Sequence, residues 1–376
     1  MEIGSEEIVC AMAVQKVMFY HIAEASRLYK RLGSAKAIAE HCDEIKSIMP
    51  DMSARQCQAL STVPEILDEC RREYEWCRQK NISILHIADD RYPQRLRQTF
   101  DAPLVLFFIG NANLNEHRVI NIVGTRKCTL YGQDLIRRFI TDLKALCPRT
   151  LIVSGLAFGV DINAHRNALE NGFSTVGVLA HGLDQIYPSQ HRETARQMLS
   201  QGGLLTEYPS HTNADKKNFI RRNRIVAGMC DATILVESAA HGGGLITTRL
   251  AQDYGRDVFA FPGAVGNPYS VGCNNLIRKS EAMLITSAED FVESMGWTDD
   301  KTLSEAQEAG IERQLFVDLS DDEQKIVNAL KEENDMQANV IATKLGMEIS
   351  KVSASLFSLE LNGMIKNVAG NIYHLL

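Results

Sequence analysis

The chain has 376 residues, of which 45% are hydrophobic and 23% are charged, and its formal net charge is −7. This composition is typical of a soluble globular protein, and the length indicates two or three domains. An acidic chain is not expected to coat duplex DNA through its global charge. The nine cysteines include no CxxC pair, which argues against a zinc ribbon or a disulfide framework and favours reduced thiols.

The start of the chain, MEIGSEEIVC, lacks the basic residues and the apolar run of a signal peptide. The longest apolar run, residues 104–109, is far shorter than the roughly 20 residues that a membrane-spanning helix needs. We therefore expect a soluble, cytoplasmic protein without membrane insertion.

Residues 1–78 carry apolar side chains at helical spacing, with turn signals at Gly33-Ser34 and Pro50-Asp51. They predict an N-terminal domain of short helices, of helix-hairpin-helix or SAM-like type around residues 28–40. The periodicity leaves two roles equally open for that motif, a structural cap and a binding unit.

Residues 79–295 change to short apolar segments that alternate with helical stretches. This order predicts an α/β domain with a doubly wound, Rossmann-like sheet. The expected strands are 82–85, 104–109, 119–123, 151–153, 175–179, 204–206, 233–236, 258–260 and 283–285. The expected helices are 133–146, 162–170, 192–199, 219–229, 246–254 and 274–279.

The end of the chain predicts a linker over residues 296–318, where periodicity is weak, followed by a winged-helix domain over residues 319–376. The tail from residue 321 onward holds five Lys and eight acidic residues. A winged helix that reads duplex DNA normally offers more cations to phosphate. The charge therefore favours a protein-contact or regulatory role for this domain.

Ligands of a doubly wound sheet bind beyond the carboxyl ends of the strands, where loops lead into helices. Four loops occupy such places. Each alone is a weak signal, because a glycine after a strand is often only a tight turn, and none is a Walker A loop or a complete GxGxxG motif. Their common position at one edge of the sheet favours an anion site. The candidate residues are Gly124 and Arg126, Ser154 and Gly155, the basic run 216–224, and Gly243, Gly244 and Thr247.

The basic run places five cations and one aromatic in nine residues. Cations interleaved with an aromatic suit single-stranded nucleic acid, whose phosphates alternate with flat bases. If a helix begins near Phe219, Arg221 and Arg224 share a face, Arg222 lies about 100° away, and the cations spread across the rim of a pocket. We expect Lys216 and Lys217 to precede this helix and reach a phosphate. Phe219 fits base stacking and core packing equally well.

The sequence predicts no catalytic residue, cofactor or metal site, because the ten histidines show no HxxxH or HExxH spacing. Asp161 and His165 stand at i, i+4 and could form an acid–base pair, but an Asp favoured at a helix start explains them better. Glu237 fits two roles equally, a general base and a carboxylate that bonds a loop.

Eight motifs in order resemble those of the DNA-processing protein A (DprA, also called Smf) family over residues 80–295. They are GTRKCTLYG, SGLAFGVDINAHRNAL, GLDQIYP, EYPS, NFIRRNRIVAG, GGGLITTRLA, GRDVFAFPG and GCNNLIRKSEA. The resemblance implies a non-enzymatic protein that binds incoming single-stranded DNA during natural transformation. Such a protein protects the DNA, loads RecA recombinase onto it, and forms a homodimer through the Rossmann-like domain.

The resemblance also implies roles for individual residues. Arg126 matches a phosphate-binding arginine, Lys216 a lysine three residues before the base-stacking aromatic, and Phe219 that aromatic. The RNR element of the family matches Arg222, Asn223 and Arg224. The glycine-rich loop and the helix start after it match Gly243, Gly244 and Thr247. The region where members dimerise matches Asn274, Asn275, Ile277, Met283 and Leu284.

The alternative function is a nucleotide-processing Rossmann-like enzyme, similar to phosphoribohydrolases that carry a PGGxGTxxE pattern. The corresponding stretch here, HGGGLITTR at residues 241–249, has no glutamate at its end, which argues against catalysis. A duplex-DNA transcription regulator acting through the tail is a third hypothesis, weakened by the acidity of the tail.

Overall fold

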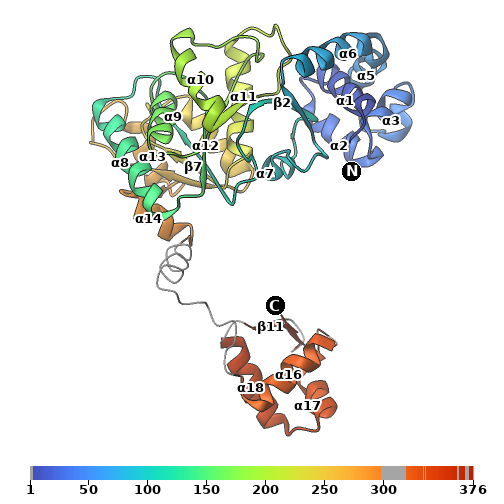
Figure 1. Ribbon diagram of the computed structural model, residues 1–376, viewed down its shortest axis with the longest axis vertical. Helices are drawn as coiled ribbons and strands as arrows, with labels where there is room; N and C mark the ends of the chain where they lie inside the picture. Colours follow the sequence, from blue (N-terminus) through green and yellow to red (C-terminus); the bar gives the residue numbers. More distant parts are fainter. Residues whose placement is uncertain are drawn as a thin grey trace. The chain divides into compact units, whose positions relative to one another are not determined.

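The computed structural model describes residues 3–297, 319–332, 334, 336–361, 364–368 and 372–375. Apart from residues 296 and 297, the predicted linker lies outside these ranges. The chain divides into two compact units, Met1–Lys301 and Thr302–Leu376 (Figure 1).

The first unit begins with short helices, as the periodicity predicted. Gly33 ends one of them in the left-handed conformation, with φ of 74°, which glycine adopts without strain. Ser34 then caps the next helix by accepting a hydrogen bond from Ala37 N. The bounds are α1 Ser5–Val17, α2 Ile22–Leu32, α3 Ala35–Glu40, α4 Ile45–Ile48, α5 Ala54–Ser61 and α6 Val63–Gln79.

The turn between α2 and α3 is closed by a carboxylate. Glu7 accepts hydrogen bonds from Ala35 N at 2.6 Å, Lys36 N at 3.0 Å and Ser34 Oγ at 2.7 Å. Burial raises the pKa of the Glu7 carboxyl, but these hydrogen bonds outweigh it and the pKa lies below its ordinary value. A helix N-terminus is a ready anion site, and here the protein fills it with its own side chain. This favours the structural-cap interpretation of the predicted helix-hairpin-helix segment.

A nine-stranded sheet lies at the centre of the first unit, in the order β1-β2-β6-β5-β4-β3-β7-β8-β9. The strands from β3 to β9 run parallel, which confirms the doubly wound prediction, whereas β1 and β2 extend the sheet antiparallel beside β6. The bounds are β1 Ser83–His86, β2 Val105–Gly110, β3 Arg118–Val123, β4 Thr150–Ser154, β5 Thr175–Val178, β6 Gly202–Thr206, β7 Ala232–Leu235, β8 Asp257–Ala260 and β9 Met283–Leu284.

Helices cover both faces of this sheet (Figure 1). Alternate side chains of β3 explain the two layers, since Ile120 packs with α8, α9 and α14, and Val119 shares a core with α11, α12 and α13. The further bounds are α7 Gln94–Arg97, α8 Leu130–Leu146, α9 Val160–Glu170, α10 Arg192–Gln201, α11 Lys216–Gly228, α12 Gly244–Asp253, α13 Val271–Arg278 and α14 Ala288–Ser294.

The N-terminal helices share a core with the sheet. Val14 of α1 and Leu28 of α2 are buried in the same hydrophobic cluster as Val105 of β2 and Val119 of β3. The predicted boundary at residue 78 therefore marks a change of secondary structure inside one compact unit.

In the described residues of the second unit, three helices pack with a three-stranded sheet in the order β10-β12-β11, which confirms the predicted winged-helix domain. Its core includes Ile326, Leu356 and Leu359. The short strand β10 was not predicted, because two residues show no period. The bounds are α16 Asp321–Glu332, β10 Met336–Gln337, α17 Ala338–Leu345, α18 Ile349–Leu361, β11 Ile365–Val368 and β12 Ile372–Leu375.

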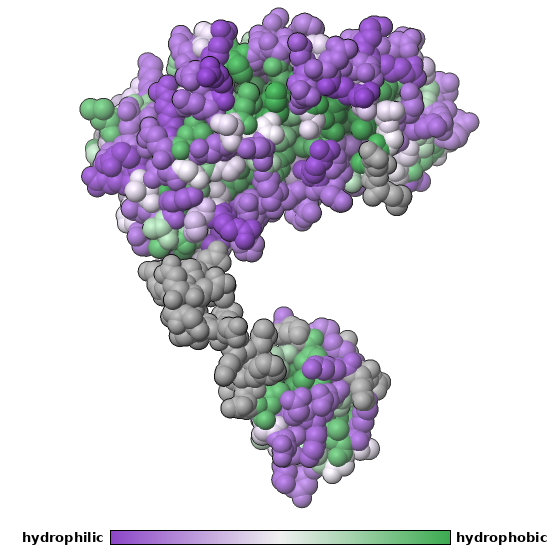
Figure 2. Space-filling view, viewed as in Figure 1, coloured by the Kyte–Doolittle hydropathy of each residue, from purple (hydrophilic) through white to green (hydrophobic). Residues whose placement is uncertain are grey.

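Among the described helices, none combines the length and the apolar character needed to cross a membrane. Figure 2 shows a mainly hydrophilic surface, with apolar residues gathered on the visible face of the first unit.

Candidate nucleic-acid interface

A cleft of about 610 Å³ opens at the carboxyl edge of the parallel strands. Strands β3 and β7 are neighbours there, although β4, β5 and β6 come between them in the chain. This reversal of strand order is the usual ligand position in such sheets. The loop after β3 forms one wall with Gly124 and Arg126, and the loop after β7 forms another with Gly243.

Helix α11 forms the third wall and begins earlier than predicted. It starts at Lys216, because Asp215 caps it by accepting a hydrogen bond from Lys217 N at 2.7 Å. Lys216 and Lys217 therefore lie in the first turn and do not precede the helix. Asp215 was the overlooked signal, since Asp is a strong N-cap residue. Lys216, Phe219 and Asn223 line the cleft from this helix.

A cation and two aromatic rings meet at the mouth of the cleft. The guanidinium carbon of the exposed Arg126 lies 5.1 Å from the centre of the Phe219 ring. The Tyr187 ring lies 5.8 Å from Phe219, centre to centre, and Tyr187 is 49% exposed. This arrangement can bind a phosphate while a ring contacts a base. Tyr187 was not among the predicted site residues, although it belongs to the GLDQIYP motif.

The glycine-rich loop presents backbone donors. Among the described residues, the N–H groups of Gly243 and Gly244 at the start of α12 have no hydrogen-bond acceptor. Such N–H groups at a helix N-terminus suit an anion. A Cβ atom on Gly244 would lie 2.7 Å from Leu235 Cδ1 and 3.1 Å from Gly124 Cα. Gly124 and Gly244 therefore let the two loops pack closely, and the buried Thr247 lines the cleft one turn further along α12.

Arg222 supports the floor of the cleft from inside. It is 3% exposed, and its Nη1 donates to Gly155 O at 2.8 Å and to Val178 O. Burial lowers the pKa of Arg222 to about 10, and the nearby Asp161 carboxylate opposes this change. A Cβ atom on Gly155 would lie 2.4 Å from Arg222 Nη2. Arg222 therefore holds the loop after β4 in place, which corrects the expectation that it stands on the rim.

Four of the predicted contact residues, Ser154, Lys217, Arg221 and Arg224, have side chains that do not line the cleft. Ser154 is buried, and its Oγ donates to Ile122 O at 2.7 Å. The prediction that Arg221 and Arg224 form the cleft rim is wrong, because the turn of α11 directs both away from the cleft.

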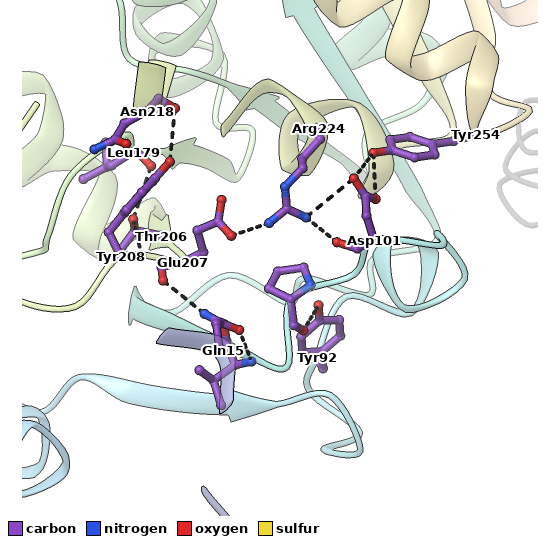
Figure 3. Close-up of polar contacts among 12 residues, drawn as sticks. Gln15, Tyr92, Asp101, Leu179, Thr206, Glu207, Tyr208, Asn218, Arg224 and Tyr254 are labelled. Carbon is purple, nitrogen blue, oxygen red and sulfur yellow. Dashed lines mark hydrogen bonds and ion pairs between the residues drawn. The ribbon is translucent and has the colours of Figure 1, made fainter. Parts of the chain in front are cut away.

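Arg224 lies at the centre of a buried network (Figure 3). Its guanidinium forms an ion pair with Glu207 and donates to Asp101 O, with the Asp101 carboxylate 4.0 Å away. Burial alone would lower the pKa of Arg224, but these carboxylates outweigh it and raise the pKa. Gln15 of α1 donates to Glu207 O at 3.1 Å, and Tyr254 donates to the Asp101 carboxylate at 2.8 Å. The network connects α11 with the N-terminal helices.

The candidate acid–base groups are also engaged inside the fold. Glu237 is 2% exposed and accepts hydrogen bonds from Thr129 N at 2.8 Å and Thr129 Oγ1 at 2.6 Å. His165 Nδ1 lies 2.7 Å from Thr175 Oγ1, and burial lowers the pKa of His165 to about 3. The described residues contain no group of three or more His, Cys, Asp or Glu able to hold a metal ion.

The predicted dimer residues lie on α13 and on β9, the last strand of the sheet order. Asn274 holds its own neighbouring loop, donating to Gly263 O at 2.9 Å and accepting from Gly263 N at 3.1 Å. Met283 and Leu284 are 42% and 49% exposed. An edge strand with exposed apolar side chains is suited to a protein contact. Asn275 and Ile277 are partly buried on α13.

Comparison with known proteins identifies the family of the chain. Residues 83–296 match the sequence model described as DNA recombination-mediator protein A, and residues 313–371 match the DprA winged helix domain. The chain belongs to the DprA/Smf family. The Smf protein of Escherichia coli K12 is 31% identical over 92% of this chain and 91% of its own length. The DprA protein of Streptococcus pneumoniae R6 is 37% identical over 60% of this chain and 78% of its own length.

Two solved structures of DprA proteins share this fold. The X-ray structure of Streptococcus pneumoniae DprA has a TM-score of 0.62 at 30% identity, and the match covers 78% of this chain and 98% of that one. The Helicobacter pylori protein, whose structure is described in terms of its single-stranded DNA binding mode, has a TM-score of 0.52 at 29% identity. That match covers 57% of this chain and 95% of the other.

Proposed function

We propose that this protein binds single-stranded DNA in the cleft between β3, β7 and α11. The observation that carries the proposal is Arg126 lying 5.1 Å from the Phe219 ring, at the point where the strand order reverses. Across the cleft, the N–H groups of Gly243 and Gly244 supply further donors for phosphate. Exposed cations and an accessible ring are together the elements of a single-strand site.

The arrangement favours unpaired over paired DNA. The Phe219 ring can stack only on a base whose face is accessible, and in a duplex both faces are covered by neighbouring base pairs. The candidate acid–base groups Glu237 and His165 are held inside the fold, which supports a binding function for the cleft.

The wider role that we propose follows from family membership. The protein protects incoming single-stranded DNA in the cytoplasm and loads RecA recombinase onto it during natural transformation and recombination. It acts as a homodimer, with the exposed β9 edge at Met283 and Leu284 as the contact surface. A charge-introducing substitution, Leu284→Lys, should shift the protein from dimer to monomer in sedimentation, and an unchanged mass would contradict this interface.

Fluorescence anisotropy with labelled oligonucleotides tests the DNA-binding proposal. We expect the protein to prefer single strands to duplex of equal length, and Arg126→Ala to lower single-strand affinity at least tenfold. With about three phosphates contacted, log affinity should fall with log salt at a slope near −2. The control is Arg138→Ala, an exposed arginine of α8 paired with Asp134. Equal affinities of the Arg126 and Arg138 variants, or salt-independent binding, would contradict the proposal.

RecA loading is tested separately, by RecA filament formation on single strands already covered by a single-strand-binding protein. Addition of this protein should shorten the lag before filaments form, and Arg126→Ala should not. An unchanged lag with the wild-type protein would refute the loading role and leave DNA binding standing.

A further inference from the structure

A second group of cations and aromatics lies on the other side of α11. The guanidinium carbon of Arg221 is 3.8 Å from the centre of the Phe19 ring and 5.3 Å from that of Tyr20. Phe19 and Tyr20 belong to the loop between α1 and α2, and their rings meet edge to face at 5.2 Å. An arginine therefore contacts aromatic rings here, as Arg126 contacts the Phe219 ring in the cleft.

Arg221 contacts aromatic rings but, unlike the next arginines of the helix, has no oxygen acceptor for its guanidinium in the described part of the chain. Among the described residues, its guanidinium has no ion pair and no hydrogen-bond acceptor, and its Nε is shielded from solvent. Arg222 and Arg224 are both bonded to oxygens of the protein. A partly desolvated cation without an acceptor is unfavourable, and burial lowers the pKa of Arg221. An anionic ligand would supply the missing acceptors.

Two exposed side chains complete this surface. Tyr20 is 75% exposed, although aromatic rings are usually buried. Lys217 lies one turn before Arg221 on the same face of α11, is exposed, and forms no ion pair within the described part of the chain. Lys217, Arg221 and Tyr20 therefore offer two cations and one accessible ring.

Two of the nearby carboxylates are paired with other cations and a third accepts hydrogen bonds within the fold, although Glu207 still opposes the effect of burial on the pKa of Arg221. Glu207 is paired with Arg224, Glu73 accepts from Ser210 N at 2.7 Å, and Glu69 pairs with Lys16 at 2.6 Å. Beside the surface runs a groove of about 740 Å³, with Phe19 in its lining. Figure 2 shows apolar residues on the visible face of the first unit, in the region that lies between the labels α11 and α6 in Figure 1.

We propose that Lys217, Arg221 and Tyr20 form a second contact surface for single-stranded DNA, which binds the strand after it leaves the cleft and crosses α11. The inference rests on the proposed function, because the ligand is the same strand. Ile220 lines the cleft and is 47% exposed, so it lies on the crossing path. The path is about 10–12 Å, the width of one helix with its side chains. The N-terminal helices thereby take part in DNA binding through the α1–α2 loop, although Glu7 closes the turn before α3.

Two oligonucleotide lengths test this surface on the full chain. An oligo(dT) of about six nucleotides fills the cleft only, and one of about 24 nucleotides also reaches the second surface. Tyr20→Ala, Lys217→Gln and Arg221→Gln should each lower the affinity for the long strand about five- to tenfold and that for the short strand less than twofold. The salt slope on the long strand should become shallower by about 0.7 for each phosphate that a variant no longer binds. Phe100→Ala, which removes an aromatic that is 60% exposed elsewhere, should change neither affinity.

The outcomes separate this proposal from the proposed function. Wild-type affinity of all three variants for the long strand would overturn the second surface. Equal losses on both strands would also overturn it, because they would show that Arg221 only positions α11. Tyr20 and Lys217 are exposed, so their variants report on the surface even if Arg221→Gln unfolds. If instead Arg126→Ala leaves binding of the short strand unchanged, the cleft itself is refuted.

Discussion

The two ends of the basic run on α11 are alike in sequence and different in structure. Lys216 and Lys217 at its start are exposed, whereas Arg222 and Arg224 at its end are 3% and 6% exposed and bonded inside the fold. Phe219 stands between them and lines the cleft. The comparison teaches that acceptors elsewhere in the chain decide which cations of a run hold the fold and which are available to a ligand.

The largest expected effect concerns the buried end of the run. Arg224→Ala leaves the Glu207 carboxylate buried without its cation, so the free energy of unfolding should fall by about 3–5 kcal/mol. Denaturant unfolding measures this, with Lys217→Ala as the matched control, expected within about 0.5 kcal/mol of wild type. Similar midpoints for the two variants would remove the distinction between the ends.

The next effect concerns the ring between the two ends. Phe219→Ala should weaken single-strand binding by about 1–3 kcal/mol, the range for a base stacked on an aromatic. Phe219→Trp should retain most of the affinity, because an indole also offers a stacking face. Anisotropy titrations report both values. If Phe219→Ala bound as tightly as wild type, the ring would be a packing residue only.

A smaller effect concerns how the stability of the fold depends on pH. His165 has its pKa lowered from 6.5 to about 3, so between these values the unfolded chain binds the proton and the folded one does not. Stability should therefore be complete above pH 6.5 and fall by up to about 1.4 kcal/mol per pH unit below it.

His165→Gln should make this decline shallower in unfolding curves at pH 7, 6 and 5. Identical pH profiles for wild type and the variant would contradict a neutral, buried His165.

The smallest effect is expected from the tail. Deletion of residues 319–376 should change single-strand affinity less than twofold, because the described cleft residues all belong to the first unit. Anisotropy on the truncated and full chains compares them directly. A large loss would restore the hypothesis that the winged-helix domain is the DNA reader.

Much of this architecture was predictable from local sequence. Short apolar segments followed by glycine placed the loops after β3 and β7, and helical periodicity between them indicated the doubly wound order. The antiparallel pair β1 and β2 could not be inferred, because apolar runs do not record strand direction. Asp215 indicates the start of α11, because Asp is a strong N-cap residue.

Which arginines are bonded inside the fold was not predictable, because their partners are distant in the chain. Asp101 lies 123 positions from Arg224, and Glu207 lies 17 positions away. Tyr187 reaches Phe219 only through the fold. No local pattern in the run distinguishes Arg221, which lacks an acceptor among the described residues, from Arg222, which bonds two carbonyl oxygens.

Photo-crosslinking tests the central claim most directly. A single-stranded oligonucleotide containing 5-iodouridine is irradiated with the full chain, and the modified peptides are identified by mass spectrometry. The cleft account predicts crosslinks at Phe219 and Tyr187, strongly reduced by Arg126→Ala and unaffected by Arg138→Ala. Crosslinks confined to residues 319–376, with none on α11, would contradict it.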